Sequence, residues 1–262
     1  MKKAFYKYQG TGNDFIIFDD RENNFHLDSD KIEKLCDRRF GVGADGVILL
    51  RSIENYDFEM VYFNADGNLS SMCGNGGRCI SALAKSLGIV KEEVNFLAID
   101  GAHIAKFTGS NPDMVKLKMK DVDLIEKVKD GWLLNTGSPH LVSLEKDINL
   151  IDVREMGSKI RYSKDFISEG VNVNFLETNK SGISVRTYER GVEDETLSCG
   201  TGVTASALVA IANNLIEGND LKVDVSTPGG ALTVYAIKTQ NGFSDIWLEG
   251  PAVLVFEGEI EI

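Results

Sequence analysis

The sequence predicts an α/β protein built from two copies of one unit, because strand-like and helix-like segments recur in its two halves in the same order. Cys73-Gly74-Asn75-Gly76 and Cys199-Gly200-Thr201-Gly202 each open a run of small and apolar residues, with the two cysteines 126 positions apart in a chain of 262. Gly12-Asn13-Asp14-Phe15 keeps this offset to Ser138-Pro139-His140-Leu141. Matched landmarks indicate an internal repeat, and the length suffices for two domains, each with its own core.

The first half reads as strands interrupted by two helices. Asp28 is placed to cap a helix whose apolar positions follow helical spacing from Ile32, and Gly41 ends it. A second helix, near Arg78–Leu87, stops at Gly88. Apolar alternation predicts strands at Lys3–Tyr8, Phe15–Phe18, Val47–Leu50, Phe58–Phe63, Val94–Ile99, His103–Phe107 and Met114–Met119.

The second half repeats this order. Helices are expected at Ser158–Phe166 and Val203–Leu215. Strands are expected at Leu141–Leu144, Val171–Leu176, Ser184–Glu189, Leu221–Val225 and Leu232–Ile237. The repeat therefore places an N-terminal domain at 1–122 and a C-terminal domain at 123–250, with 251–262 expected to cross back and pair with the first domain.

Composition excludes several classes of partner. The net charge of −12 argues against nucleic acid and against an anionic membrane surface. The basic N-terminus lacks the apolar run of a signal peptide, and no apolar segment is long enough to span a bilayer, so a cytoplasmic location is expected. The four cysteines form no C-x-x-C pair and no histidine lies at ligand spacing, so neither a metal site nor a disulfide framework is expected.

Cys73 and Cys199 are the candidate reactive groups. Glycines after each cysteine let a ligand approach backbone N–H groups, and a helix N-terminus favours both a carboxylate and a thiolate. Two matched thiols suit a reaction that removes a proton from one face of a carbon and returns it to the other, which is racemisation or epimerisation. Cys36 and Cys79 lie at apolar helical positions, where a cysteine is ordinarily an inert core residue.

Polar residues near these thiols have two interpretations each. Asn13, Asn64 and Asn172 lie beside or near glycines, where asparagine is commonly a turn residue, although a substrate amide contact is equally open. Glu189-Arg190 ends a strand ten residues before the second cysteine, and His140 follows a proline. A surface histidine with satisfied hydrogen bonds is the plain alternative for His140.

Over essentially its whole length the chain resembles the diaminopimelate epimerase family, whose enzymes use no cofactor. The resemblance rests on seven segments: Gly10-Thr11-Gly12-Asn13-Asp14-Phe15, Phe63-Asn64-Ala65-Asp66-Gly67, Cys73-Gly74-Asn75-Gly76-Gly77-Arg78-Cys79, Pro139-His140, Glu169-Gly170-Val171-Asn172, Glu189-Arg190-Gly191 and Glu195-Thr196-Leu197-Ser198-Cys199-Gly200-Thr201-Gly202. It implies two pseudo-symmetric α/β (α+β) domains, each a curved, mainly antiparallel sheet around a central helix, with the active site in the cleft between them.

The resemblance also implies roles for individual residues. Cys73 and Cys199 would be the catalytic acid and base in the conversion of LL-2,6-diaminopimelate to the meso form, in lysine and peptidoglycan-precursor synthesis. His140 and Glu189 would help to set the protonation and orientation of the thiols. Substrate would be bound by Asn13, Asn64, Asn172, Glu189 and Arg190, and by the backbone at Gly74, Asn75, Gly200 and Thr201.

Two departures from the family pattern bear on fine contacts. Ser138 stands where the family commonly has asparagine, and Glu193-Asp194 replaces a glycine and lengthens the loop. The alternative function is a two-thiol racemase of the same fold acting on histidine, proline or hydroxyproline. A rival from another class is a thiol redox or thiol-acylating protein; the absence of C-x-x-C disfavours redox, whereas a Cys199–His140 couple keeps acylation open. The sequence leaves a homodimer open.

Overall fold

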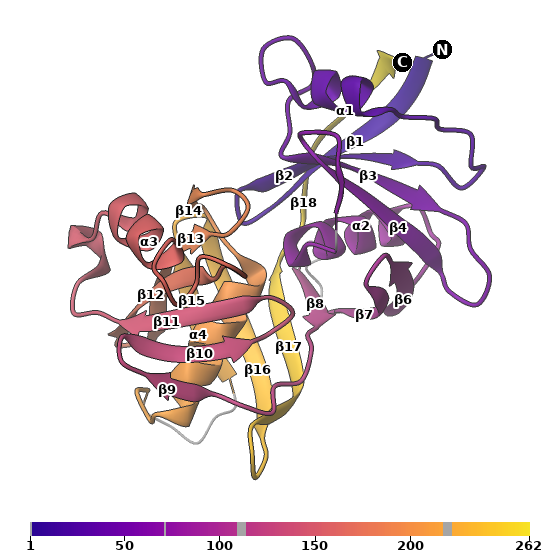
Figure 1. Cartoon of the computed structure of the whole chain (residues 1–262). Coiled ribbons are helices and arrows are strands. Elements are labelled where there is room, and N and C mark those ends of the chain that lie inside the picture. Colours follow the sequence, from indigo (N-terminus) through magenta and orange to yellow (C-terminus); the bar gives the residue numbers. More distant parts are fainter. Residues whose placement is uncertain (1, 71, 109–113, 217–221) are drawn as a thin grey trace. The chain divides into compact units, whose positions relative to one another are not determined.

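A computed structural model of the chain describes residues 2–70, 72–108, 114–216 and 222–262 (Figure 1). The chain forms two compact units: unit 1 is Met1–Leu117 with Gly250–Ile262, and unit 2 is Lys118–Glu249. The limits expected from the repeat, 1–122 with 251–262 and 123–250, stay a prediction for the domains as independently folding bodies. Within the described ranges, no helix is both long and apolar enough to cross a membrane.

In unit 1, the described strands surround helix α2 (Gly74–Ser86), and α1 (Ser29–Cys36) lies nearer the N-terminus. The helix α2 contacts β1, β2, β3 and β7, and every residue from Gly74 to Ala84 is buried. Pairing is antiparallel except between β2 and β3 and between β4 and β6. The strands are β1 (Lys2–Gly10), β2 (Asn13–Asp19), β3 (Gly46–Arg51), β4 (Phe58–Asn64), β5 (Leu69–Ser70), β6 (Glu93–Ala98), β7 (Gly101–Phe107), β8 (Met114–Lys118) and β18 (Val253–Glu261).

Unit 2 repeats the pattern around helix α4 (Gly200–Ala212), preceded by the 3-10 turn η1 (Ile148–Leu150) and helix α3 (Val153–Arg161). Its parallel pairs, β11 with β12 and β13 with β15, correspond to the two parallel pairs of unit 1. The strands are β9 (Glu126–Val128), β10 (Gly131–Asn135), β11 (Pro139–Leu144), β12 (Asn172–Asn179), β13 (Gly182–Glu189), β14 (Asp194–Thr196), β15 (Lys222–Thr227), β16 (Gly230–Lys238) and β17 (Phe243–Pro251). The predicted α/β class and its pseudo-symmetry are therefore confirmed.

Helix α4 is apolar around nearly its whole circumference, because strands of unit 2 cover it from several directions and leave little of it exposed. It contacts β10, β11, β12, β13, β15 and β16 (Figure 1). Small residues permit this approach: a side chain at Gly202 would collide with the Asn174 amide. A helix buried around its circumference does not need the one-sided apolar stripe of a surface helix.

A second apolar core lies on the outer side of each sheet. In unit 1 it packs Phe5, Phe18 and Phe25 against α1, with the Phe18 and Phe25 rings 4.9 Å apart. In unit 2 it packs Val153 of α3 against Phe175 and Tyr188. Each sheet is therefore covered by a central helix on one face and by a shorter helix on the other, which fixes the strands that carry the polar residues described below.

Helix limits were the least accurate part of the sequence prediction. The helix expected at Ser158–Phe166 is wrong in position: α3 begins at Val153, because the Asp152 carboxylate caps it by accepting a hydrogen bond of 2.9 Å from the Glu155 N–H. Helices α2 and α4 begin earlier than expected, directly after the cysteines. Strands β9, β10, β14 and β17 were not predicted, and Leu221 of the expected strand Leu221–Val225 lies outside the described residues.

Candidate active site

Each of the two candidate cysteines is the N-cap residue of a central helix. Cys73 precedes α2 and Cys199 precedes α4, both with extended backbone, and neither cap includes a side-chain hydrogen bond. The first helical bonds are donated by Gly77 N–H to Cys73 O and by Val203 N–H to Cys199 O, each 2.8 Å. The N–H groups earlier in both first turns have no partner within the helix, so each helix start can bind a carboxylate.

The turn between β1 and β2 brings Asn13 to Cys73. Gly10 pairs with Asn13, and the two residues between them, Thr11 and Gly12, have φ values of 51° and 87°. This is the two-residue hairpin geometry that requires positive φ at both central positions. A β-branched residue rarely adopts it, and the buried Thr11 hydroxyl accepts a 3.3 Å hydrogen bond from Arg78 Nη2 that holds it there.

Four polar side chains form a continuous path beside Cys73. The Cys73 thiol donates to Asn13 Oδ1 at 3.4 Å, and Asn13 Nδ2 donates to the Asp45 carboxylate at 2.7 Å. Asn75 Nδ2 also donates to Asn13 Oδ1, at 3.3 Å, and Arg78 Nη2 donates to Asn75 Oδ1 at 3.0 Å. We call Arg78, Asn75, Asn13 and Asp45 the amide chain.

An ion cluster supports the strand that carries Asn13. The Asp14 carboxylate pairs with Lys7 and with Arg38, each at 2.7 Å, and Arg38 also pairs with Asp45 at 2.7 Å. Burial alone would raise the pKa of Asp14, but hydrogen bonds from Arg38 and Lys7 outweigh it and lower the pKa to about 2. The cluster is therefore charged at neutral pH.

In unit 2, Asn172 and Arg190 share a partner in Ser138. Asn172 Nδ2 donates to Ser138 Oγ at 2.9 Å, and Arg190 Nη2 donates to the same oxygen at 3.3 Å. The Arg190 backbone N–H donates to Asn172 Oδ1 at 2.9 Å, and its Nη1 donates to Glu169 O at 2.8 Å. Ser138, one of the positions that depart from the family pattern, thus accepts hydrogen bonds from two of the side chains expected to bind substrate, Asn172 and Arg190.

His140 is fully buried and neutral. Burial first, and the Arg190 charge second, lower its pKa to about 3. The Asn174 amide donates to His140 Nδ1 at 3.2 Å, which leaves the proton on Nε2, and Nε2 has no partner among the described residues. The Leu141 carbonyl, which can only accept, fixes the direction of that amide by accepting from Asn174 Nδ2 at 3.1 Å, and the Thr187 hydroxyl donates to Asn174 Oδ1 at 2.9 Å. The surface alternative for His140 is wrong, because the ring has no exposed area.

The remaining expected residues lie at the start of α4 and at the ends of two strands. Cys199 Sγ lies 3.5 Å from Thr201 Oγ1, and the Thr201 carbonyl accepts from Thr136 Oγ1 at 2.9 Å. Glu189 ends β13 half-buried. Asn64 ends β4, also half-buried, and its side chain makes no hydrogen bond to another described residue.

Sequence reasoning missed two polar residues that contact the expected site, Asp45 and Asn174. It named Arg78 within a motif but gave it no role. Asn174 could have been found, because it lies two positions after Asn172 on one strand, and so on the same face. Asp45 carried no such signal, since its contact with Asn13 joins residues far apart in the sequence.

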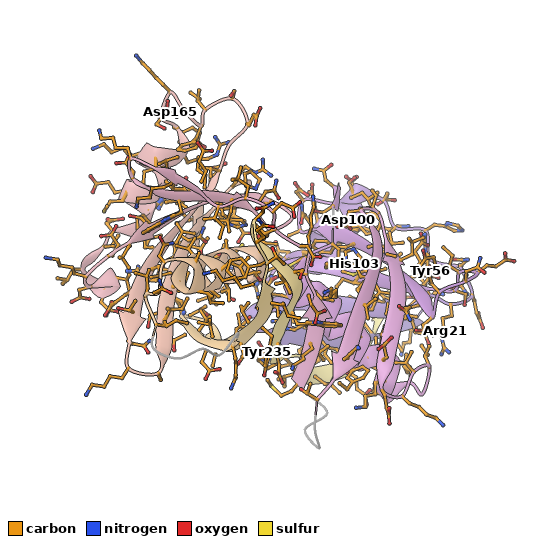
Figure 2. The ribbon with its side chains drawn as sticks, turned by 90° about the horizontal axis from the view of Figure 1, so that it is seen from below. Arg21, Tyr56, Asp100, His103, Asp165 and Tyr235 are labelled. Atoms are coloured by element: carbon orange, nitrogen blue, oxygen red, sulfur yellow. The ribbon has the colours of Figure 1, made fainter. Side chains whose placement is uncertain are left out.

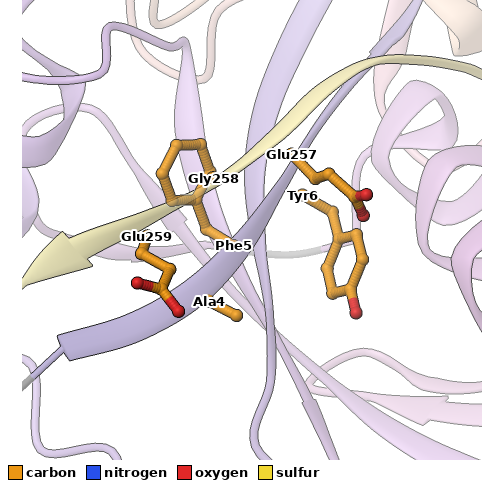
Figure 3. Close-up of a pocket in the computed structure, with 6 residues that line it drawn as sticks. All are labelled: Ala4, Phe5, Tyr6, Glu257, Gly258 and Glu259. Carbon is orange, nitrogen blue, oxygen red and sulfur yellow. The ribbon is translucent and has the colours of Figure 1, made fainter.

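Other features of the described residues do not add to the site. The thiols of Cys36 and Cys79 are buried, which raises their pKa to about 11 and about 12 and keeps them protonated. No cluster of three or more His, Cys, Asp or Glu side chains in the described ranges is placed to hold a metal ion. A shallow pocket between β1 and β18, with Phe5 and Gly258 in its wall, includes none of the expected site residues (Figure 3).

Comparison with known proteins identifies the family. The diaminopimelate epimerase profile matches residues 5–125 and 132–255. The diaminopimelate epimerase of Flavobacterium psychrophilum is 49% identical over 97% of this chain and 99% of its own length. Those of Chlorobaculum tepidum and Aquifex aeolicus are 40% and 37% identical, over 97% and 98% of this chain and 99% and 97% of their own.

Solved structures with the same fold include more distant proteins. A phenazine biosynthesis protein of the PhzF family from Bacillus anthracis superposes over the whole of both chains with a TM-score of 0.75 at 16% identity. A probable proline racemase from Agrobacterium radiobacter covers 99% of this chain and 93% of its own with a TM-score of 0.64 at 14% identity. These show the shared fold alone, whereas the full-length sequence matches show that the chain belongs to the diaminopimelate epimerase family.

Proposed function

We propose that this chain converts LL-2,6-diaminopimelate to meso-diaminopimelate without a cofactor, as a step in the synthesis of lysine and of the peptidoglycan precursor. The observation that carries the proposal is the match to the family along the whole chain, with a cysteine at the start of both central helices. The geometry supports an acid and a base of the same chemical type, because the two cysteines occupy equivalent backbone positions.

The proposed reaction transfers one proton off and one proton on. The thiolate of one cysteine removes the α-hydrogen, the C–H electron pair is delocalised into the substrate carboxylate, and the thiol of the other cysteine returns a proton to the opposite face. The second cysteine is then the thiolate, so the reverse reaction exchanges the two roles. The backbone N–H groups at Gly74, Asn75, Gly200 and Thr201, in the first turns of α2 and α4, are suited to the carboxylate, and each well-placed donor is worth about 3 kcal/mol in such a transition state.

Several polar side chains are proposed to select the substrate. Diaminopimelate has an amino-acid group at each end, so the end that does not react needs partners of its own. Asn64, Asn172 and Arg190 supply amide and guanidinium groups of the right chemistry, and Ser138 links the latter two. Asn13 and Glu189 complete the proposed binding set, and His140, with a free Nε2–H, and Glu189 are proposed to orient the thiols.

A cytoplasmic location is part of the proposal, supported by four free cysteines that a reducing compartment would preserve. A homodimer stays a prediction. We expect the chain to use a small-molecule amino acid and neither nucleic acid nor a membrane.

The deciding experiment incubates the purified chain with LL-diaminopimelate and separates the stereoisomers by chromatography. The expected result is approach to a mixture of LL and meso forms, unaffected by a chelator or by hydroxylamine. Parallel incubations with L-histidine, L-proline and trans-4-hydroxy-L-proline test the alternative racemases. Turnover of one of these in place of diaminopimelate would overturn the substrate assignment but keep the two-thiol chemistry, whereas loss of activity on chelation would overturn the chemistry.

A further inference from the structure

The amide chain beside Cys73 has a fixed direction, because each of its ends permits only one kind of hydrogen bond. A guanidinium only donates, so the Asn75 atom facing Arg78 must be oxygen, and the Asn75 NH₂ group then faces Asn13. A carboxylate only accepts, so the Asn13 atom facing Asp45 must be the NH₂ group. The Asn13 oxygen is therefore left to face both Asn75 and the Cys73 thiol.

We propose that Asp45 and Arg78 are positioning residues that direct the amides of Asn13 and Asn75, so that the Asn13 oxygen holds the proton of Cys73 in the free enzyme. The inference rests on the proposed catalytic role of Cys73 and adds a residue, Asp45, that lies outside the expected set. An amide oxygen stabilises a thiol and offers nothing to a thiolate. Turning the same amide around would present an N–H donor and have the opposite effect.

Arg78 acts in two ways on this cysteine. Its guanidinium has no exposed area, and among the described residues it contacts only neutral acceptors: Asn75 Oδ1, Thr11 Oγ1, Gly74 O and Pro251 O. Desolvation lowers the pKa of Arg78, and the charge of a thiolate at Cys79 or Cys73 would raise it. Since Cys79 stays protonated, Cys73 is the partner whose negative charge would offset the buried cation, and the Asn13 oxygen opposes that ionisation.

Other titratable groups belong to the elements of unit 1 around the same region. Arg78 and Cys79 come from α2, Lys7 from β1, Asp14 from β2, Arg38 and Asp45 from the segment before β3, and His103 from β7 with its partner Asp100. Unit 2 has no equivalent of the amide chain: at the 126-residue offset its four positions are Pro139, Val171, Thr201 and Thr204. Thr201 Oγ1, next to Cys199, can donate or accept, so it tolerates either form of that thiol.

The test is the pH dependence of alkylation at each cysteine, read by mass spectrometry after brief exposure to iodoacetamide. Asp45→Asn keeps the shape of the side chain but can donate, which removes the constraint at that end of the amide chain. Only the Asn75 NH₂ group then still opposes a turn of the Asn13 N–H groups toward Cys73. We expect the Cys73 midpoint to fall by about one pH unit, a tenfold gain in the thiolate ratio, as a hydrogen bond to a charged group is gained. Cys199, the N-cap residue of α4, is the internal reference, because none of the four amide-chain residues recurs at the equivalent positions of the repeat.

Asp100→Asn is the matched control for charge. Asp45 and Asp100 are exposed to a similar degree, 43% and 41%, and Asp100 accepts from the N–H of Met72, next to Cys73, at 3.2 Å, and lies 3.3 Å from His103 (Figure 2). Both substitutions remove one negative charge, but only Asp45→Asn frees the Asn13 amide. An equal shift in both variants, or no shift in either, would overturn the positioning role.

A second measurement uses the wild-type protein and does not depend on either variant folding. The S–H stretching band of Cys73, identified by its loss in Cys73→Ser, should lie below the frequency of a free thiol because the thiol donates to Asn13. A band at the free-thiol frequency, or no Cys73 band at neutral pH, would contradict the proposal. Neither measurement requires turnover, so a failure here leaves the proposed reaction standing, and inactivity toward diaminopimelate leaves the alkylation result standing.

Discussion

The starts of α2 and α4 share a backbone and differ in almost every polar side chain around it. In both, a cysteine N-cap with extended backbone precedes a buried helix whose N-terminus has no side-chain cap. Around Cys73 the amide chain is charged at both ends, by Arg78 and Asp45. Near Cys199 and β11, Thr201, Thr204, Asn174 and His140 are neutral, and the charge of Arg190 acts on His140. The two halves therefore share the helix starts proposed to bind a carboxylate and differ in the polar side chains next to each cysteine.

The largest expected effect tests whether both helix starts are needed. Cys73→Ser and Cys199→Ser should each lower epimerisation by about 10³-fold or more, because serine is nearly isosteric but a far weaker acid. The measurement is the rate of conversion of LL to meso substrate, with circular dichroism as the control for folding. A variant that keeps a tenth of the wild-type rate would show that one thiol serves both faces.

The second prediction compares Asp14 and His140, which occupy equivalent positions of the repeat. The His140 pKa is lowered from 6.5 to about 3, so the stability it provides is complete above pH 6.5 and is lost as the pH falls toward 3. The Asp14 pKa is lowered from 3.8 to about 2, so its contribution is lost only between those values. The free energy of unfolding of unit 2 should fall by about 3 kcal/mol between pH 6.5 and roughly pH 4. Asp14 does not begin to titrate in this range, so its contribution to the stability of unit 1 should not change.

Native-state hydrogen exchange at a series of pH values measures this difference strand by strand. Protection in β11 and β12 should fall at a higher pH than protection in β1 and β2. The control is His140→Gln, which removes the titrating group and should flatten the pH dependence of unit 2. Simultaneous loss of protection in both units would show that His140 is not the weak point on acidification.

The third prediction compares equivalent residues within the two helices. Arg78→Met should destabilise unit 1 by about 2 to 3 kcal/mol, because Asn75, Thr11 and two carbonyls lose their donor. Thr204→Val should cost less than about 1 kcal/mol, since the Thr204 hydroxyl only bonds back to Gly200 O within its own helix. Hydrogen exchange in α2 and α4 provides both values, and equal costs would mean that the buried guanidinium is not structural.

The smallest effect concerns substrate choice. Arg190→Ala and Asn64→Ala should each lower kcat/KM for diaminopimelate by roughly 30-fold, about 2 kcal/mol, as a charged or amide partner of the substrate is lost. Arg154→Ala is the control, because Arg154 is 75% exposed and its nearest carboxylate, on Asp194, is 3.9 Å away. Unchanged kinetics in Arg190→Ala would assign that side chain to the support of Ser138 and Glu169 alone.

The sequence predicted the features that recur in both halves and those that depend on neighbouring residues alone. The offset between the cysteines located both central helices, and Gly88 marked the end of α2. The expected end of the first helix at Gly41 was wrong, because α1 already ends at Cys36, with Asp37 as its C-cap. The prediction failed where a weaker local signal competed: the apolar residues near Ile160 suggested a late helix, although Asp152 caps an earlier one. It also missed β10, a short segment whose place in the sheet depends on its pairing with β9 and β11.

The site divides in the same way. Residues inside conspicuous motifs, such as Asn13, Asn172 and Arg190, could be proposed as site residues from the chain alone, and this assignment stays a prediction. Asp45 and the direction of the Asn13 amide could not, because they depend on contacts between strands distant in sequence, and the role of Arg78 emerges only once its burial and its partners are known.

The pairing of β18 with β1 has a consequence for folding during synthesis on the ribosome. β1 pairs with β18 from Lys2 with Glu261 to Gln9 with Val253, so β1 is paired by a strand that is translated after the whole of unit 2. Unit 2 is continuous in sequence and can fold while synthesis continues, which reverses the usual order in which N-terminal domains fold first. Arg78 also donates to Pro251 O. The hydrogen bonds of the polar groups next to Cys73 can therefore all form only after the segment with Pro251 has been made, and unit 1 cannot finish folding before β18 is available.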